Sequence, residues 1–354
     1  MSNAFTRTGL FGQLFQDGEV ADAFSAEIFV SRMITFERAW TQALARVGVV
    51  DQASESAALA AIDAFTPDFS GLSAASDVDG LPLPNLVSQL RAGMPEPVQK
   101  AVHTGTTSQD VIDTAMIMTC QHLLSVFAAR GAAILVQLDG LDDAFGNNAM
   151  MGRTRMQAAL PITVHDRLRI WRGPLAQQLH ALTVLIEQSR VLQAGGAVGL
   201  RDKPQAQADA VATHVADTLG LKVVPLWHAD RSAILDLGNW LVKTAGLLGK
   251  LGQDIALMAQ QGVDEVALEG AGGSSAMPHK QNPIRAEALV TLGRFVAGQQ
   301  GVLGQSMIHE QERSGAAWAL EWMTLPLMFE ATGASLNNAA VLLSQIRRLG
   351  GSAG

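Results

Sequence analysis

The sequence predicts an all-α protein, and three observations carry that prediction. Apolar residues recur at intervals of three or four over most of the 354 residues, which is the spacing of one face of an α-helix. Several of these stretches run for about thirty residues, well beyond the ~11–12 residues of an average helix. Strand signals are scarce, because the β-branched run at 221–227 is interrupted by Pro225 and indicates an extended connector.

The first hundred residues are predicted to form shorter helices. Apolar periodicity predicts helices over residues 19–47, 54–65 and 85–92, separated by turns that contain proline, such as LPLPN and MPEP. Beyond Gln99 the periodic stretches become much longer. We therefore predict a small N-terminal helical domain over residues 1–100 and a bundle of long helices over residues 101–347.

Five long helices are predicted to build this bundle. They cover residues 108–145, 161–193, 231–261, 283–307 and 314–346. Pro161 and Pro283 stand at the expected first turns of two of them, where the missing N–H of proline is harmless because it would have no intrahelical partner. A helix of about thirty residues is ~45 Å long at 1.5 Å per residue.

Charge and composition exclude several classes of protein and of binding site. Acidic residues outnumber basic ones by 33 to 25, so the net charge is −8 and the chain lacks the basic footprint of a nucleic-acid-binding protein. Cys120 is the one cysteine, which excludes an intramolecular disulfide and a cysteine-ligated zinc site. We find no secretory signal, no ~18-residue apolar run, no metal-ligand cluster and no dinucleotide fingerprint. We expect a cytoplasmic protein that binds neither membrane nor nucleic acid and needs no metal or cofactor.

Three polar segments interrupt the predicted helices and are the candidate functional regions. They cover residues 103–113, 152–163 and 262–287, and each combines glycine or hydroxyl, amide and cationic side chains at a helix end. Polar residues on loops that a rigid scaffold holds are where binding and catalysis concentrate. An anionic substrate would require cations to be gathered locally against the negative net charge.

The segment 262–287 carries the most chemistry. Ser274 and Ser275 supply hydroxyls after a run of glycines, Lys280 supplies a compact positive charge, and Asn282 supplies an amide. Arg285 falls in the first turn of the next predicted helix, where the helix dipole disfavours a cation. A bound anion explains that arginine better than helix stability does. The alternative is a glycine-rich surface connector with incidental charges.

The string GSSAMPHKQNP, residues 273–283, closely resembles the signature of the fumarase/aspartase superfamily. That superfamily includes adenylosuccinate lyase, argininosuccinate lyase and 3-carboxy-cis,cis-muconate cycloisomerase. The resemblance implies that Ser274 is the catalytic base on a loop that closes over substrate. It also implies that Lys280 and Asn282 bind and polarise a substrate carboxylate, with Ser275 and Arg285 in contact with the substrate. Fixed cations and amides would stabilise the charge that develops when the adjacent carbon exchanges a proton.

The string HTGTTSQDVIDTA, residues 103–115, resembles the first conserved region of the same family. Thr107 and Ser108 open a long predicted helix, where hydroxyls and free N–H groups either cap the helix or hold a carboxylate. The resemblance favours substrate binding by both residues. His103 is a candidate catalytic residue, and two roles stay open: donation to the substrate and anchoring of the loop.

The string GRTRMQAALPIT, residues 152–163, resembles the second region with one departure. Gln157 keeps the place of an amide that contacts the substrate. Arg155 stands where adenylosuccinate and argininosuccinate lyases carry a histidine assigned to proton transfer. An arginine stays protonated and cannot shuttle a proton, but it can hold a carboxylate through two hydrogen bonds. We therefore expect a substrate that carries an extra anionic group.

Three further strings are similar to the bacterial cycloisomerase branch: LQAGGAVG, PLWHADR and HEQERSGAAWALEWMTLP. The resemblance implies an intramolecular lyase that closes a carboxymuconate to a lactone, and its substrate is a small polyanionic dicarboxylate or tricarboxylate. A 3-sulfomuconate cycloisomerase is one alternative, since arginine accepts carboxylate or sulfonate. A lyase that releases fumarate, such as adenylosuccinate lyase, and a non-enzymatic helical scaffold are the others. The tryptophans of the third string also fit plain core packing.

The resemblance runs over about residues 5 to 345 and implies a homotetramer whose active sites are shared between chains. Polar segments at opposite ends of ~45 Å helices cannot meet around one small substrate within a single bundle. Antiparallel packing of several bundles would bring them together. Typical family members continue for about a hundred residues into a small helical third domain, which we expect this chain to lack.

Overall fold

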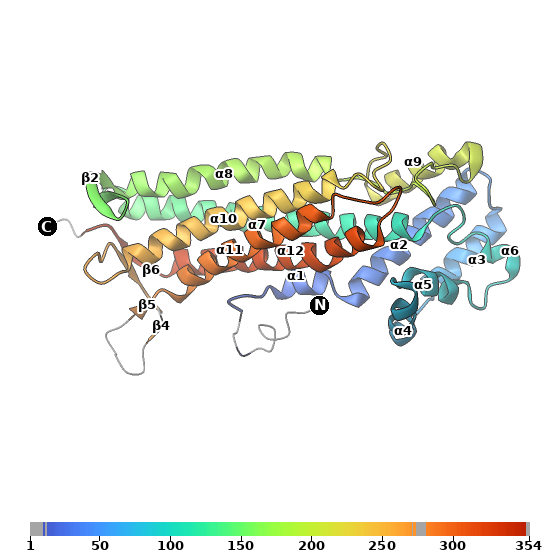
Figure 1. The fold of residues 1–354 in the computed structure, drawn as a ribbon, viewed down its shortest axis with the longest axis horizontal. Helices are drawn as coiled ribbons and strands as arrows, with labels where there is room; N and C mark the ends of the chain where they lie inside the picture. The colour runs from blue at the N-terminus through green and yellow to red at the C-terminus, as the bar shows by residue number, and fades with distance from the viewer. Residues whose placement is uncertain (1–9, 11–12, 271, 274–280, 352–354) are drawn as a thin grey trace.

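The computed structural model describes residues 10, 13–270, 272–273 and 281–351, and within them it is a bundle of long α-helices (Figure 1). Five helices lie side by side: α7 (Ser108–Phe145), α8 (Val164–Gln188), α10 (Ser232–Met258), α11 (Ile284–Gln305) and α12 (Gly315–Ser344). The all-α prediction is confirmed. The chain direction alternates along the bundle, so the start of α7 and the start of α11 lie at opposite ends (Figure 1).

Shorter helices gather at the end of the bundle where α7 begins (Figure 1). They are α2 (Ala26–Arg46), α3 (Gln52–Asp63), α4 (Phe69–Asp79), α5 (Leu83–Arg91), α6 (Glu96–Gln99), the 3₁₀ turn η1 (Gln205–Gln207) and α9 (Ala208–Leu219). The short helix α1 (Gly18–Ala23) instead packs against α12 beside the middle of the bundle (Figure 1). The single helix predicted over 19–47 is divided in two. The reason is Ser25, whose side chain accepts a hydrogen bond from the N–H of Ile28 at 3.3 Å and so starts α2 afresh.

The described strands form three short antiparallel pairs near the opposite end of the bundle (Figure 1). β1 (Ala149–Thr154) pairs with β2 (Gln157–Thr163), β3 (Val266–Leu268) with β6 (Ile346–Leu349), and β4 (Gly272–Gly273) with β5 (Gln281–Asn282). The sequence did not predict them. β3 to β6 are too short to show a period of two. β1 and β2 are mostly exposed and show no alternation of buried and exposed residues, and they contain glycine or proline, which weaken a strand signal.

The prediction that Pro161 opens a helix is wrong. Pro161 lies in β2 opposite Met151, and α8 begins three residues later. Thr163 caps that helix: its hydroxyl accepts from the N–H of Asp166 at 3.3 Å, and the Asp166 carboxylate accepts from the N–H of Thr163 at 3.0 Å. This reciprocal capping box satisfies two otherwise free donors and decides the start of the helix. Pro161 by itself satisfies none of the free N–H donors at a helix start.

Small residues let α10 and α11 approach closely in the middle of the bundle. A Cβ at Gly252 would lie 2.5 Å from the carbonyl oxygen of Ala286, and one at Gly293 would lie 2.9 Å from that of Ala245. Both distances are shorter than a carbon–oxygen contact allows. The glycines therefore fix the spacing of the two helices, and with it the relative positions of the end of α10 and the start of α11.

One described helix, α7, is long and apolar enough to cross a membrane by length and composition, although none was predicted to do so. In the structure 67% of its most apolar window is buried inside the protein. The core helix of a soluble bundle passes the same test of length and composition, because its apolar residues cover all faces rather than one.

Candidate active site

The first polar segment lies immediately before α7, at the end of the bundle that carries the short helices. His103 is held there with a left-handed backbone, φ +58°. Its Nδ1 lies 2.5 Å from Oε1 of Glu37, a carboxylate of α2 that is fully buried. Sequence reasoning missed Glu37. The available signal was a carboxylate on the apolar face of a predicted helix, beside Phe36 and Trp40.

The first turn of α7 is fastened by the buried carboxylate of Asp110. It accepts hydrogen bonds from the N–H of Thr107 at 3.1 Å and from the N–H groups of Gly195 and Gly196 at 2.7 and 3.1 Å. Burial raises the pKa of this carboxyl, and the donated hydrogen bonds oppose that rise. Asp110 therefore has a structural task. Thr107 and Ser108 stay half-buried.

The turn that leads into α7 needs glycine at one position. Gly105 has φ +82°, and a Cβ there would lie 3.2 Å from the carbonyl carbon of Lys203. The backbone of Lys203 thus packs directly against this turn. The side chain of Lys203 is exposed.

Three further polar side chains, His228, His309 and Arg313, lie at this end of the bundle. Arg313 donates from Nε to Oε1 of Gln109 at 2.8 Å. Burial, followed by the charge of Arg313, lowers the pKa of His228, and burial followed by the charge of Arg231 lowers that of His309. Both imidazoles are therefore neutral at pH 7. His228 Nδ1 and His309 Nε2 are buried without a hydrogen-bond partner among the described residues.

Beneath them a buried ion network joins the starts of α7, α10 and α12. Arg231 is fully buried and donates to Asp113 at 2.8 and 3.1 Å and to Glu321 at 2.7 Å through both Nε and Nη2. Trp318 donates to Asp113 Oδ1 at 2.8 Å, which explains the first tryptophan of the third string as a structural residue. Residues of the strings PLWHADR and WALEW therefore form the buried network that holds the start of α7 in place. Sequence reasoning did not pair them.

The second polar segment is a β-hairpin that extends from the other end of the bundle (Figure 1). Arg155 and Met156 form its two-residue turn, with φ of +51° and +66°, and Thr154 pairs with Gln157 across it. The side chains of Arg155 and Gln157 are exposed. Arg153 ties the hairpin to Glu265, the residue before β3, whose Oε1 accepts at 2.6 Å. The hairpin therefore presents Arg155 away from the bundle of its own chain.

The third polar segment is described in part. Asn282 is half-buried in β5, and Arg285 in the first turn of α11 donates to Oδ1 of Asn338 at 2.8 Å. Ser274, Ser275 and Lys280 lie outside the described residues.

One chain does not bring the predicted site residues together. His103, Thr107 and Ser108 lie where α7 begins, whereas Arg155, Gln157, Asn282 and Arg285 lie near its far end (Figure 1). The 38 residues of α7 span about 57 Å. No small substrate reaches from one group to the other.

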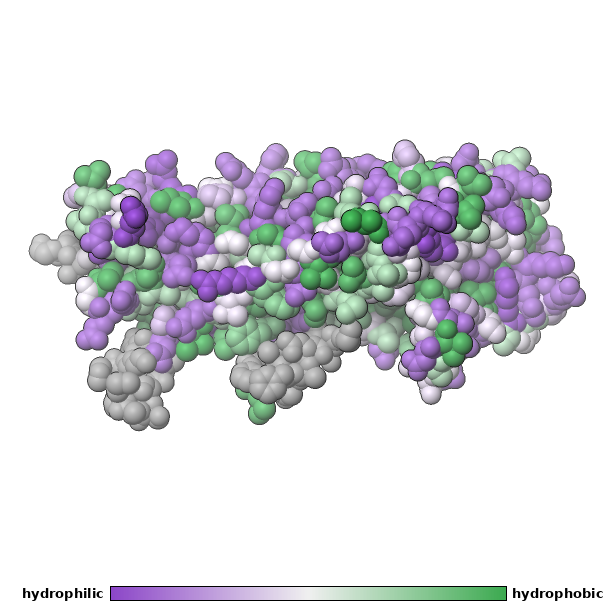
Figure 2. Space-filling view, viewed as in Figure 1, coloured by the Kyte–Doolittle hydropathy of each residue, from purple (hydrophilic) through white to green (hydrophobic). Residues whose placement is uncertain are grey.

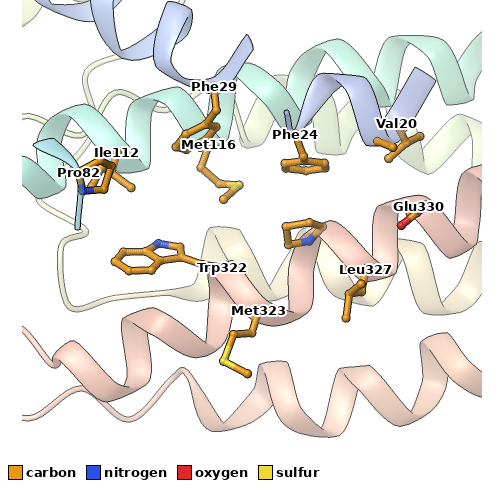
Figure 3. Close-up of a pocket in the computed structure, with 12 residues that line it drawn as sticks. Val20, Phe24, Phe29, Pro82, Ile112, Met116, Trp322, Met323, Leu327 and Glu330 are labelled. Carbon is orange, nitrogen blue, oxygen red and sulfur yellow. The ribbon is translucent and has the colours of Figure 1, made fainter. Parts of the chain in front are cut away.

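An apolar cavity of about 350 Å³ lies between α1, α2, α7 and α12 (Figure 3). Its lining includes Phe24, Phe29, Met116, Trp322 and Met323. It contains none of the predicted site residues, and such a lining does not suit a polyanion. Among the residues that the structure describes, no group of three or more His, Cys, Asp or Glu side chains is placed to hold a metal ion.

Comparison with known proteins identifies the family. The lyase family profile matches residues 16–298. The 3-carboxy-cis,cis-muconate cycloisomerase of Acinetobacter baylyi is 34% identical over 345 residues, which cover 94% of this chain and 76% of the relative. The chain belongs to the fumarase/aspartase lyase family. It is therefore an enzyme of the lyase type, and all three polar segments fall within the matched region.

Solved structures of the lyase family share the fold. The 3-carboxy-cis,cis-muconate lactonizing enzyme of Pseudomonas putida superimposes with a TM-score of 0.90 at 32% identity, covering 96% of this chain and 78% of that one. A fumarate lyase from a Mesorhizobium species gives a TM-score of 0.89 at 28% identity, with the same coverage of both chains. The fold is thus shared by lyases with different substrates, and the substrate has to be argued from the site.

Proposed function

We propose that the protein is a cycloisomerase that converts 3-carboxy-cis,cis-muconate to 4-carboxymuconolactone, in the protocatechuate branch of the β-ketoadipate pathway in the cytoplasm. The observation that carries the proposal is Arg155, an exposed cation in place of the lyases' histidine, together with 34% identity to a cycloisomerase. Arginine binds an additional carboxylate but cannot relay a proton.

The reaction follows from the groups in the three segments. One carboxylate of the substrate adds to its conjugated double bond, forming a C–O bond, and the carbon next to another carboxylate receives a proton. Since a carboxylate becomes an ester, one proton is taken up overall. Ser274 transfers the proton, while Lys280 and Asn282 stabilise the charge that develops on the neighbouring carboxylate. Because nucleophile and acceptor belong to one molecule, orientation is already largely supplied.

Arg155 is proposed to bind the extra carboxylate of the substrate. The Arg155→Lys variant keeps the charge and, at an exposed turn position, leaves the hairpin undisturbed. It loses the planar fork that donates two hydrogen bonds to one carboxylate. We expect a clear rise in KM with little change in kcat, measured from initial rates of lactonisation. If Arg155→His creates fumarate release while lactonisation is unchanged, Arg155 does not bind substrate.

We further propose that the active sites are shared between the chains of a homotetramer. About 57 Å separates the two groups of site residues along α7, and the hairpin extends away from its own bundle. Exposed apolar residues are interspersed with polar ones over the long helices (Figure 2). On α11 they include Phe295 and Val302, exposed by 37% and 40%. Antiparallel packing of copies would cover such residues and bring opposite ends together.

Mixing two inactive variants tests the shared site. Ser274→Ala and Thr107→Ala chains are dissociated together and reassembled, and activity is compared with each variant reassembled alone. Because some hybrid sites then receive only intact segments, we expect a fraction of wild-type activity to return. No recovery from mixtures that native mass spectrometry shows to be hybrid, or a fully active monomer, would refute the proposal.

A panel of four substrates tests the function itself. Ultraviolet absorbance is followed with 3-carboxymuconate, 3-sulfomuconate, adenylosuccinate and argininosuccinate at matched concentrations. The proposal expects the highest kcat/KM with 3-carboxymuconate. Preference for the sulfonate would identify a 3-sulfomuconate cycloisomerase. Release of fumarate would favour the second candidate, an intermolecular lyase, which the likeness to the Mesorhizobium fumarate lyase supports. No turnover of any compound would favour a helical scaffold.

A further inference from the structure

Helix α2 holds the segment that precedes α7 with three side chains on one of its faces. Thr41 Oγ1 and Trp40 Nε1 each donate to a backbone carbonyl of the segment 101–104, both at 2.9 Å. One turn earlier, Glu37 Oε1 lies 2.5 Å from Nδ1 of His103. Residues three and four apart share a helix face, so the three contacts act on one short stretch of chain.

Anchoring of this segment does not explain Glu37. Trp40 and Thr41 already fasten its backbone at both ends, and both are buried. Glu37 is 0% exposed, and its Oε2 has no hydrogen-bond partner among the described residues. Burying a carboxylate with one unsatisfied oxygen is expensive, and an apolar side chain would fill the same place more stably. The carboxylate therefore points to a role beyond folding.

The partner of Glu37 is held in an unusual conformation. His103 has a left-handed backbone, which is uncommon for a residue with a Cβ and collects at functional sites. Since a carboxylate accepts at Nδ1, that nitrogen carries a proton, and Nε2 is the nitrogen left for a ligand. No described residue bonds Nε2, and the side chain keeps 17% of its area exposed. His103 precedes Thr107 by four residues in the chain.

We propose that Glu37 is a positioning residue for His103: Nδ1 donates to Glu37, and this orients the ring so that Nε2 donates to a carboxylate of the substrate beside Thr107 and Ser108. The inference rests on the proposed function. A ring that donates from both nitrogens, to Glu37 and to the substrate, suits a polyanionic substrate. Of the two roles open for His103, this assigns contact with substrate rather than anchoring of the loop.

Two substitutions in α2 separate positioning from folding. Glu37→Gln keeps the shape and an acceptor but removes the charge. Thr41→Val, the matched control, removes a buried hydrogen bond to the same segment and leaves the pair intact. We expect Glu37→Gln to raise KM for 3-carboxymuconate roughly tenfold or more, the effect of losing a charged hydrogen bond. Thr41→Val should lower Tm but change KM by less than about twofold.

A double-mutant cycle and a spectroscopic readout complete the test. His103→Asn removes the imidazole with a residue that tolerates the left-handed backbone. Combined with it, Glu37→Gln should raise KM no further, because the carboxylate acts through the ring. In ¹⁵N NMR spectra, Nδ1 of His103 should be protonated in the wild type and both ring nitrogens should shift in Glu37→Gln.

Independent effects of the two substitutions on KM, a normal KM in Glu37→Gln, or a His103 with an unprotonated Nδ1 would each overturn the inference. The proposed function fails separately, when the wild-type protein does not lactonise 3-carboxymuconate. The NMR comparison, repeated with a saturating inert tricarboxylate, still decides the role of Glu37 in that case.

Discussion

Ser274→Ala should lower kcat for lactonisation at least ~10²-fold, the scale of assistance that a positioned acid or base provides. The expectation rests on Ser274 being the first serine of the GSSAMPHKQNP string. A hydroxyl is a poor base unless nearby cations and N–H groups stabilise its alkoxide. Lys280 provides such a cation six residues later in the same string. Since alanine removes the transferring oxygen and little volume, KM should change much less than kcat.

Ser275→Ala is the matched control for this prediction, because it deletes the same oxygen one residue further along. We expect Ser275→Ala to act mainly on KM, as a loss of substrate binding. The measurement is a pair of Michaelis curves, with circular dichroism to show that both variants are folded. An inactive Ser275→Ala beside a nearly normal Ser274→Ala would show that the assignment of the two serines is wrong.

The fold could be predicted from the sequence because helical periodicity is a local property. The stretch 108–145 matches α7 at both ends, since Thr107 and Asp110 provide start signals within four residues. The errors lie where two local signals competed. At residues 161–164 the capping box of Thr163 prevailed over Pro161, and at residue 25 a single hydroxyl divided a continuous apolar pattern.

The candidate site was predictable only as separate segments. Strings such as HTGTTSQD mark where polar residues stand in the chain, but not which of them meet. Glu37 and His103 are 66 residues apart, and Arg231 and Asp113 are 118 apart, so neither pairing has a sequence signal. Each required the packing of α2 or α10 against the start of α7. The separation of the two ends of the bundle followed from helix length alone.

Arg231→Met should lower the free energy of unfolding by about 3–5 kcal/mol at pH 7, the cost of removing one partner from a buried ion network. Arg231 is fully buried and is shared by Asp113 and Glu321, which are each 2% exposed. Methionine fills much of the volume but leaves two carboxylates facing each other without a cation. The measurement is urea unfolding at one fixed protein concentration, because association between chains would add to apparent stability.

The stability deficit of Arg231→Met is expected to depend on pH, because the pKa of Glu321 differs between the folded and unfolded chain. Burial raises the pKa of Glu321 to about 6 from 4.5, with Arg231 opposing the rise. Without Arg231 that pKa rises further, so the folded variant keeps a proton that the unfolded chain releases. Its stability therefore falls as pH rises from about 4.5 through the raised folded pKa, and the deficit should be larger at pH 7 than at pH 5. Arg46→Met, at an exposed position of α2, is the control and should change stability by no more than ~0.5 kcal/mol. A variant as stable as the wild type at pH 7, or a deficit that grows towards pH 5, would show that Arg231 does not neutralise the two carboxylates.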